Sequence, residues 1–197
     1  NEYDDLDYLD ISNRFREFNN KKEMKNVLLT GASGFLGTHI LFKLLSSYKD
    51  VKVTCLVRDE KRFYSSLDYY FDKSDVVNMK RRISCVIGDI REDNLGLEVD
   101  IYNKERNEID TVIHTAANIK HFGVFEDFYK TNVKGTEEVI KFCLKSGARM
   151  YHISTMSVSG QGIIKQSQKM PEFSESNLYI GQAYKDNVYV HTKYLAE

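Results

Sequence analysis

The chain has 197 residues, of which 42% are hydrophobic and 29% are charged, a composition typical of a folded globular domain. Its net charge of −1 argues against a general nucleic-acid-binding protein, because such proteins carry a basic excess. Every apolar run is shorter than the about 18 residues of a membrane span. The N-terminus is acidic where a secretory signal would be basic. We therefore expect a cytoplasmic protein that binds neither nucleic acid nor membranes.

The first 22 residues differ in charge from the rest. Six acids and two arginines among residues 1–20 give this segment a net charge of −4, so the remainder carries +3. We interpret 1–22 as an acidic linker or peripheral helix and 23–197 as one domain. The positive remainder is compatible with phosphate binding, although a mixed surface beside an acidic linker explains it equally well.

From residue 26 onward, short apolar runs alternate with helical patterns. The predicted strands cover about 26–30, 52–57, 83–87, 110–114 and 149–154. The predicted helices cover about 35–47, 59–71 and 126–146, with another from near 185. This alternation predicts an α/β fold with a Rossmann-type doubly wound parallel sheet. The irregular stretch 156–183 follows a strand end, where such sheets build their sites.

A glycine-rich turn connects the first predicted strand to the first helix. In a strand–turn–helix context this motif indicates dinucleotide binding, with the pyrophosphate on the amides that begin the helix. The glycines allow a tight turn and close approach of the backbone. The predicted cofactor-binding residues here are Gly31, Ser33, Gly34, Phe35, Leu36 and Gly37.

The residue that ends the second strand reads the adenosine ribose in this fold. An acid there binds the 2′-hydroxyl of NAD, whereas an arginine accepts the 2′-phosphate of NADP. Arg58 occupies this position, with Lys61 and Arg62 close by, so we predict NADPH. Asp59 keeps NAD as an alternative, and Arg58 as a solvated surface residue is the simplest other interpretation.

The ends of the third and fourth strands supply further cofactor contacts. Asp89 is placed to bind the adenine amino group while Ile90 packs on the ring. Ala116, Ala117 and Asn118 allow the backbone to lie against the ribose and pyrophosphate. An ordinary turn aspartate and small residues that relieve crowding are the structural alternatives.

Tyr189 and Lys193 are four residues apart in the last predicted helix and therefore share a face. A lysine ammonium near a phenol lowers the phenol pKa, which makes it an acid or base near neutrality. Both residues are also predicted to contact the cofactor. A hydroxyl after the fifth strand completes the set, with Ser154, Thr155 and Ser157 as candidates.

The remaining reactive side chains predict no metal site. Cys55, Cys85 and Cys143 lack metal-ligand spacing, and we interpret all three as small buried apolar residues in a reducing compartment. We expect His121 in a loop and His191 on the helix face that points away from Tyr189.

These motifs occur in the order and spacing of the extended short-chain dehydrogenase/reductases. They are the 30–37 turn, Gly88-Asp89-Ile90, residues 131–136 and Tyr189-to-Lys193. Within that branch, residues 173–182 leading into 187–197 resemble the thioester reductase domains that end nonribosomal peptide synthetases. Fatty acyl-CoA and carboxylic acid reductases share much of the pattern.

The resemblance implies a catalytic triad of Thr155, Tyr189 and Lys193, in which Thr155 is selected by its offset from Val158 and Gly160. It implies that Asn132 braces the helix after the fourth strand and that the cofactor is NADPH. The implied reaction is reductive release of an acyl or peptidyl thioester from a phosphopantetheinylated carrier domain, as aldehyde or further to alcohol. It also implies a C-terminal substrate-binding region after Glu197, so the chain alone is expected to be inactive.

Two rival functions remain open at this point. A nucleotide-sugar epimerase, dehydratase or hydroxysteroid-type dehydrogenase of the same branch is one, although Arg58 disfavours the NAD that such enzymes often use. A non-catalytic NADP-binding module is the other, and the Tyr189/Lys193 pair disfavours it.

Overall fold

The computed structural model describes residues 23–120, 122–160, 173–174, 177–184 and 187–197. Within them, five parallel strands form one sheet in the order β3-β2-β1-β4-β5. The bounds are β1 Asn26–Thr30, β2 Lys52–Val57, β3 Ile83–Ile87, β4 Thr111–His114 and β5 Arg149–His152. All five predicted strands are thus confirmed, with the last two slightly shorter than expected. The predicted linker 1–22 lies outside the described residues.

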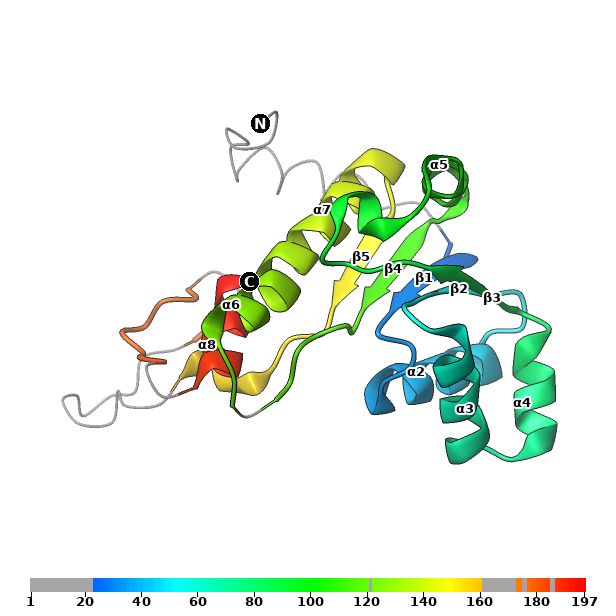
Figure 1. Ribbon diagram of the computed structural model, residues 1–197, viewed down its shortest axis with the longest axis horizontal. Helices are drawn as coiled ribbons and strands as arrows, with labels where there is room; N and C mark the ends of the chain where they lie inside the picture. Colours follow the sequence, from blue (N-terminus) through cyan, green and yellow to red (C-terminus); the bar gives the residue numbers. More distant parts are fainter. Residues whose placement is uncertain (1–22, 121, 161–172, 175–176, 185–186) are drawn as a thin grey trace.

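The sheet is covered on both faces, as continuous apolar strands require. Alternate residues of β1 enter opposite cores: Val27 and Leu29 belong to one and Leu28 to the other. Helices α2 (Phe35–Ser47), α3 (Glu60–Tyr70) and α4 (Lys73–Lys80) cover the first face. Helices α5 (Val99–Glu108) and α7 (Gly135–Ser146) cover the second (Figure 1). This arrangement confirms the doubly wound α/β fold.

Two helices were not predicted. Helix α4 buries only Val76 and Met79, and α5 buries only Tyr102 and Glu105. Their remaining residues are mostly charged or polar, so the sequence shows no continuous apolar stripe. The expectation for Cys85 was also wrong in part: Cys55 and Cys143 are buried, but Cys85 is half-buried. It lies at the edge of the sheet, because among the described strands β3 is paired only with β2.

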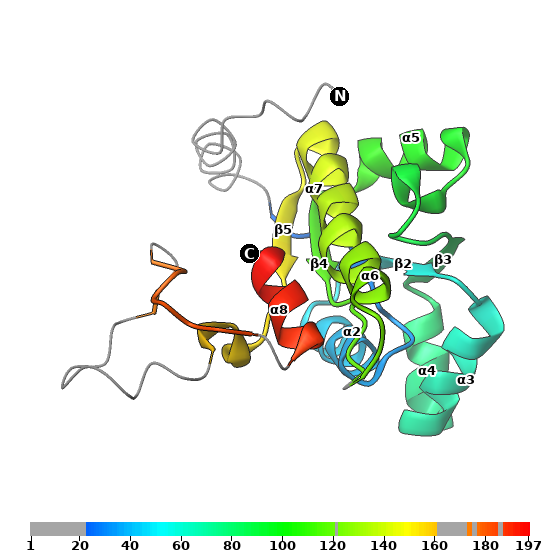
Figure 2. The ribbon, with the colours of Figure 1, turned by 60° about the vertical axis from the view of Figure 1, so that its left-hand side comes forward.

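The predicted helix over 126–146 is confirmed but is not uniform. It consists of α6 (Phe125–Phe128), a π-helical turn η2 (Tyr129–Lys134) and then α7. Figure 2 shows α6 and α7 following one another along one side of the sheet, with α8 (Val188–Leu195) beside them. Helix α8 begins three residues later than expected, because Asn187 caps it by accepting a hydrogen bond from the Val190 amide at 3.1 Å.

Residues 161–172 and 175–176 of the predicted irregular stretch 156–183 lie outside the described residues. Its described part contains a short 3₁₀ helix, η3 (Met156–Ser159), and an isolated bridge between Ser174 and Asn177. Another 3₁₀ turn, η1 (Asp93–Gly96), follows β3. None of the helices in the described residues is long and apolar enough to cross a membrane.

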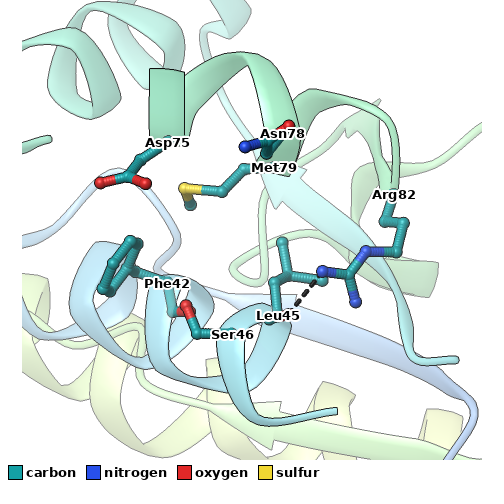
Figure 3. Close-up of a pocket in the computed structure, with 7 residues that line it drawn as sticks. All are labelled: Phe42, Leu45, Ser46, Asp75, Asn78, Met79 and Arg82. Atoms are coloured by element: carbon teal, nitrogen blue, oxygen red, sulfur yellow. Dashed lines mark hydrogen bonds between the residues drawn. The ribbon is translucent and has the colours of Figure 1, made fainter. Parts of the chain in front are cut away.

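Arg82 joins α2 to the segment between α4 and β3. Its guanidinium donates to the backbone carbonyls of Tyr48 at 2.6 Å and Lys49 at 3.2 Å, and to that of Leu45. Figure 3 shows this side chain reaching the end of α2 across a small cavity, with the bond to Leu45 dashed. No basic residue stands in the last turn of α2 itself, so Arg82 supplies the positive charge that favours a helix C-terminus.

We predict that Arg82→Gln lowers the free energy of unfolding by about 1.5–3 kcal/mol, the typical contribution of hydrogen bonds from a charged donor. Arg81→Gln is the matched control, because Arg81 is exposed at the neighbouring position. Urea denaturation of both variants measures the difference. Equal stability of the two variants would contradict this role for Arg82.

Candidate active site

A cleft of about 900 Å³ opens at the carboxyl ends of the strands. It is lined by residues that follow β1, β2, β3 and β4 and by the side chains of Tyr189 and Lys193 from α8. The chain order of the strands reverses between β1 and β4. Open parallel sheets bind ligands at such a switch point, because the loops that leave the two strands diverge there.

The glycine turn after β1 forms one wall of the cleft, and its shape depends on missing side chains. Gly31 has φ +73°, and a Cβ atom there would lie 2.7 Å from the amide nitrogen of Ala116. A Cβ atom at Gly37 would lie 2.2 Å from the Gly31 carbonyl oxygen. At these two glycines, therefore, one segment of backbone packs directly against another, with no room for a side chain. Gly34 differs, because its Cβ would meet only the Gly31 carbonyl, at 3.3 Å.

The first turn of α2 presents its backbone amides without competition from side chains. Gly34 is the N-cap, no side chain caps the helix, and the first turn contains no acid. By contrast, Asp59 caps α3 by accepting from the Arg62 amide at 3.0 Å. An uncapped helix start beside glycines fits a dinucleotide pyrophosphate. All the residues predicted in this turn line the cleft: Gly31, Ser33, Gly34, Phe35, Leu36 and Gly37.

Positively charged side chains from the segments that follow β2 and β3 line the cleft. Arg58, Arg62 and Arg91 all line it, together with Asp59. Arg91 forms an ion pair with Asp89 at 2.6 Å. Burial raises the pKa of Asp89, but the hydrogen bonds and charge of Arg91 outweigh this effect and leave that pKa below its usual value. The predicted adenine ligand is therefore an ionised carboxylate already engaged by Arg91.

Ile90 lines the cleft while also being part of the second core. It packs under α7, since a Cβ atom at Gly135 would lie 2.6 Å from the Ile90 Cδ1 atom. Ala116 and Ala117 also line the cleft, as expected. Asn118 is not among the lining residues, and its backbone is hydrogen-bonded elsewhere.

That engagement is with Asn132, a buried residue of the π-helical turn. The Asn132 side chain accepts from the Asn118 amide at 2.7 Å and donates to the Asn118 carbonyl at 3.1 Å. It also donates to the Thr192 hydroxyl at 2.9 Å. Asn132 was expected to brace its own helix. The structure extends that role, because the side chain also connects to α8.

Lys193 is buried, with 2% exposure, yet it lines the cleft. Its Nζ atom donates to the Ile153 carbonyl at 2.9 Å and lies 3.1 Å from His152 Nε2. Burial lowers the pKa of Lys193 to about 8, an effect that Glu197 partly opposes. Tyr189, one turn earlier on α8, is half-buried and lines the same cleft.

Thr155, the predicted third member of the triad, is placed differently from Tyr189 and Lys193. The Thr155 hydroxyl accepts from the Ser157 amide at 3.3 Å, at the start of η3. Thr155 is not among the residues that line the cleft, whereas Ser154 is. The Ser154 hydroxyl is buried and has no hydrogen-bond partner within the described residues.

Several cleft residues were not predicted from the sequence. They are Thr115, Ile119, Thr131, Arg91 and Ile153. Of these, Arg91 had a usable signal, since it lies two residues after the predicted aspartate, and Thr131 begins the 131–136 motif. His191 stacks on Tyr184 with 5.8 Å between ring centroids and is not among the cleft residues, as expected. His121 lies outside the described residues.

Comparison with known proteins agrees with this geometry. Residues 29–197 match the family described as male sterility protein, whose domain binds NAD. Among solved structures, a thiolation-reductase di-domain of an archaeal nonribosomal peptide synthetase is 32% identical, with a TM-score of 0.73. The similarity covers 98% of this chain and 54% of that one.

Curated relatives are long synthetases. The hybrid PKS-NRPS synthetase fsa1 of a Fusarium species is 34% identical over 62% of this chain and 3% of its own length. The isonitrile lipopeptide synthase of Mycobacterium tuberculosis is 31% identical over 69% of this chain and 6% of its own. The chain thus spans about half of the solved reductase and a small part of each synthetase. With a family match over residues 29–197, a doubly wound sheet and a dinucleotide cleft, the chain belongs to the NAD-binding male sterility protein family and resembles the terminal reductase domains of peptide and polyketide–peptide synthetases.

Proposed function

We propose that residues 23–197 form the NADPH-binding unit of a reductase that releases a carrier-bound acyl or peptidyl thioester as an aldehyde, or further as an alcohol. The observation that carries the proposal is the position of Tyr189 and Lys193 in the same cleft as the uncapped start of α2. The similarity to a reductase that is joined to a thiolation domain supports a phosphopantetheinylated carrier domain as the partner.

The cleft has the features that a dinucleotide phosphate needs. The amides that begin α2 would hold the pyrophosphate, and Ala116 and Ala117 leave room for the backbone beside it. Arg58 and Arg62 would hold the 2′-phosphate, which favours NADPH over NADH. Asp59 is the acid that NAD binding would need, but its carboxylate already caps α3.

When bound, NADPH supplies the hydride that reduces the thioester carbonyl carbon. Tyr189 would donate a hydrogen bond to the carbonyl oxygen, where negative charge develops, and would then protonate it. Lys193 would hold ribose hydroxyls and place a positive charge near the phenol. Collapse of the resulting hemithioacetal breaks the carbon–sulfur bond and gives the aldehyde and the carrier thiol.

Thr155 is the proposed second donor to the carbonyl oxygen. Its hydroxyl accepts from the Ser157 amide, and this contact leaves the hydroxyl proton free to be donated. Ser154 is the neighbouring alternative, because its buried hydroxyl lines the cleft.

The glycine turn gives a test that separates cofactor binding from folding. We predict that Gly34→Ala folds with a loss of less than about 1 kcal/mol, since its Cβ atom at the helix N-cap meets only the Gly31 carbonyl oxygen, at 3.3 Å, and a shift of a few tenths of an ångström relieves this contact. Its NADPH affinity should fall at least about tenfold, because the methyl group stands where the phosphate approaches. Gly37→Ala is the contrasting variant and should fail to fold, given the 2.2 Å approach to Gly31. Thermal denaturation and fluorescence titration measure both properties. Unchanged NADPH affinity in a folded Gly34→Ala chain would contradict the assigned pyrophosphate site.

The choice of cofactor depends on Arg58. We predict that Arg58→Ser lowers NADPH affinity at least about tenfold and leaves NADH affinity nearly unchanged, because only the 2′-phosphate is lost as a partner. Lys61→Ser is the control, since Lys61 is not among the residues that line the cleft. Parallel titrations with the two cofactors decide the point, and equal losses for both would argue against a 2′-phosphate contact.

The reaction itself is tested on the full-length protein with a carrier-bound acyl thioester and NADPH, with the products identified by mass spectrometry. We expect aldehyde or alcohol from the wild type. Tyr189→Phe should reduce turnover at least about 100-fold, in the range found for lost general acid catalysis, with NADPH affinity nearly unchanged. NADPH binding without thioester consumption by the wild type would point instead to a non-catalytic module or a different substrate class.

A further inference from the structure

Two of the three N–H donors of Lys193 contact acceptors in or next to β5, namely His152 in the strand and Ile153 directly after it. One points to the Ile153 carbonyl oxygen at 2.9 Å and one to His152 Nε2 at 3.1 Å. An ammonium has three donors and no acceptor, so these two contacts leave one N–H. Because the Lys193 side chain is buried yet lines the cleft, that remaining N–H is the one available to a ligand.

The contact with His152 requires a neutral imidazole whose Nε2 atom accepts. Burial and the charge of Lys193 lower the pKa of His152 to about 4, so the ring is neutral at physiological pH. Acceptance at Nε2 places the ring proton on Nδ1. Nδ1 is buried and has no hydrogen-bond partner among the described residues.

The other groups near His152 do not compete for Nε2. From β4, the ring of His114 lies 5.3 Å away between centroids, but both of its nitrogens contact threonine hydroxyls, Thr30 at 2.7 Å and Thr136 at 3.1 Å. Burial, with the nearby His152 and Lys193, lowers the pKa of His114 to about 3. After α8, the Glu197 carboxylate lies 4.0 Å from His152 Nε2, beyond hydrogen-bond distance.

We propose that His152 is a positioning residue for Lys193: its neutral imidazole, together with the Ile153 carbonyl, fixes two N–H groups of the ammonium so that the third faces the cofactor cleft. The relevance of this contact to catalysis rests on the proposed function, in which that third N–H holds the cofactor ribose. The contact between His152 and Lys193 does not depend on the proposed function, because it involves only residues of this chain.

The proposal has a measurable electrostatic consequence. A hydrogen bond that is accepted from an ammonium favours its charged form and so opposes the effect of burial. Removing the acceptor should therefore lower the pKa of Lys193 further. A substitution of His152 that provides an acceptor oxygen should keep the pKa of Lys193 near its wild-type value.

The first experiment is performed on the wild-type chain and requires no substitution. With ¹⁵N-labelled histidine, two-bond nitrogen–proton NMR spectra report which ring nitrogen of His152 carries the proton. We expect protonated Nδ1 and unprotonated Nε2 at pH 7. Protonated Nε2 would overturn the proposal, because such a nitrogen cannot accept from Lys193.

The second experiment measures the pKa of Lys193 by NMR titration of ¹³C-labelled lysine, with the signal assigned by its loss in Lys193→Arg. We expect His152→Leu to lower the Lys193 pKa by about one unit, a tenfold change in the protonation constant. His152→Gln, whose amide oxygen accepts, should stay within about 0.3 unit of the wild type. An unchanged pKa in His152→Leu, or an equal fall in His152→Gln, would overturn the proposal. If His152→Leu does not fold, the wild-type tautomer and His152→Gln still decide it.

Neither readout needs substrate or turnover, so the two proposals fail separately. The expected tautomer and pKa shift together with no thioester reduction by the full-length protein would overturn the proposed function alone. Thioester reduction with protonated Nε2 on His152 would overturn the role of His152 alone.

Discussion

The Asn132 side chain connects three segments of the chain: the π-helical turn that contains it, the residues after β4, and α8, whose Tyr189 and Lys193 line the cleft. It is 1% exposed, and it bonds both backbone groups of Asn118 after β4 and the Thr192 hydroxyl on α8. Thr192 precedes Lys193 directly, so this bond fixes the rotation of α8 about its axis. The orientation of Lys193 therefore depends on a residue 61 positions earlier in the chain. A buried amide with all these partners is stable, whereas each partner left unpaired costs about 1–3 kcal/mol.

The start of α2 shows the opposite arrangement. Helices α3 and α8 are capped by the side chains of Asp59 and Asn187, but α2 begins at Gly34 without a side-chain cap or an acid in its first turn. The free amides at a helix start normally find such partners. A helix start without such partners is locally less stable, and its free amides at the cleft are the feature to which we assign the cofactor pyrophosphate in our proposal. Helices α4, α5, α6 and α7 also lack a side-chain cap, but each has an acid in its first turn, so among the described α-helices only α2 has neither.

Much of the fold could be predicted, because the strands and the glycine turn carry strong local signals. Buried parallel strands are continuous apolar runs, and Gly31 and Gly37 stand where backbone packs on backbone. Helices α4 and α5 escaped prediction because each buries only two residues. The contact of His152 with Lys193 could not be predicted, since 41 positions separate them and only β5 and α8 together place them. The arrangement of Ser154 and Thr155 was also beyond prediction, because a 3₁₀ turn decides which hydroxyl faces the cleft.

The π-helical turn at Tyr129–Lys134 makes the number of residues between β4 and α7 a constraint in itself. A π turn accommodates one more residue than an α turn within the same helix. Deleting a single residue there would convert the wide turn into an ordinary α turn and leave the helix on either side of it facing the same way. Helix α7 would keep its buried face of Val139 and Phe142, but Asn132 lies inside the wide turn and would shift relative to Asn118 and Thr192. The number of residues in this turn therefore sets where the Asn132 amide stands, independently of which residues they are.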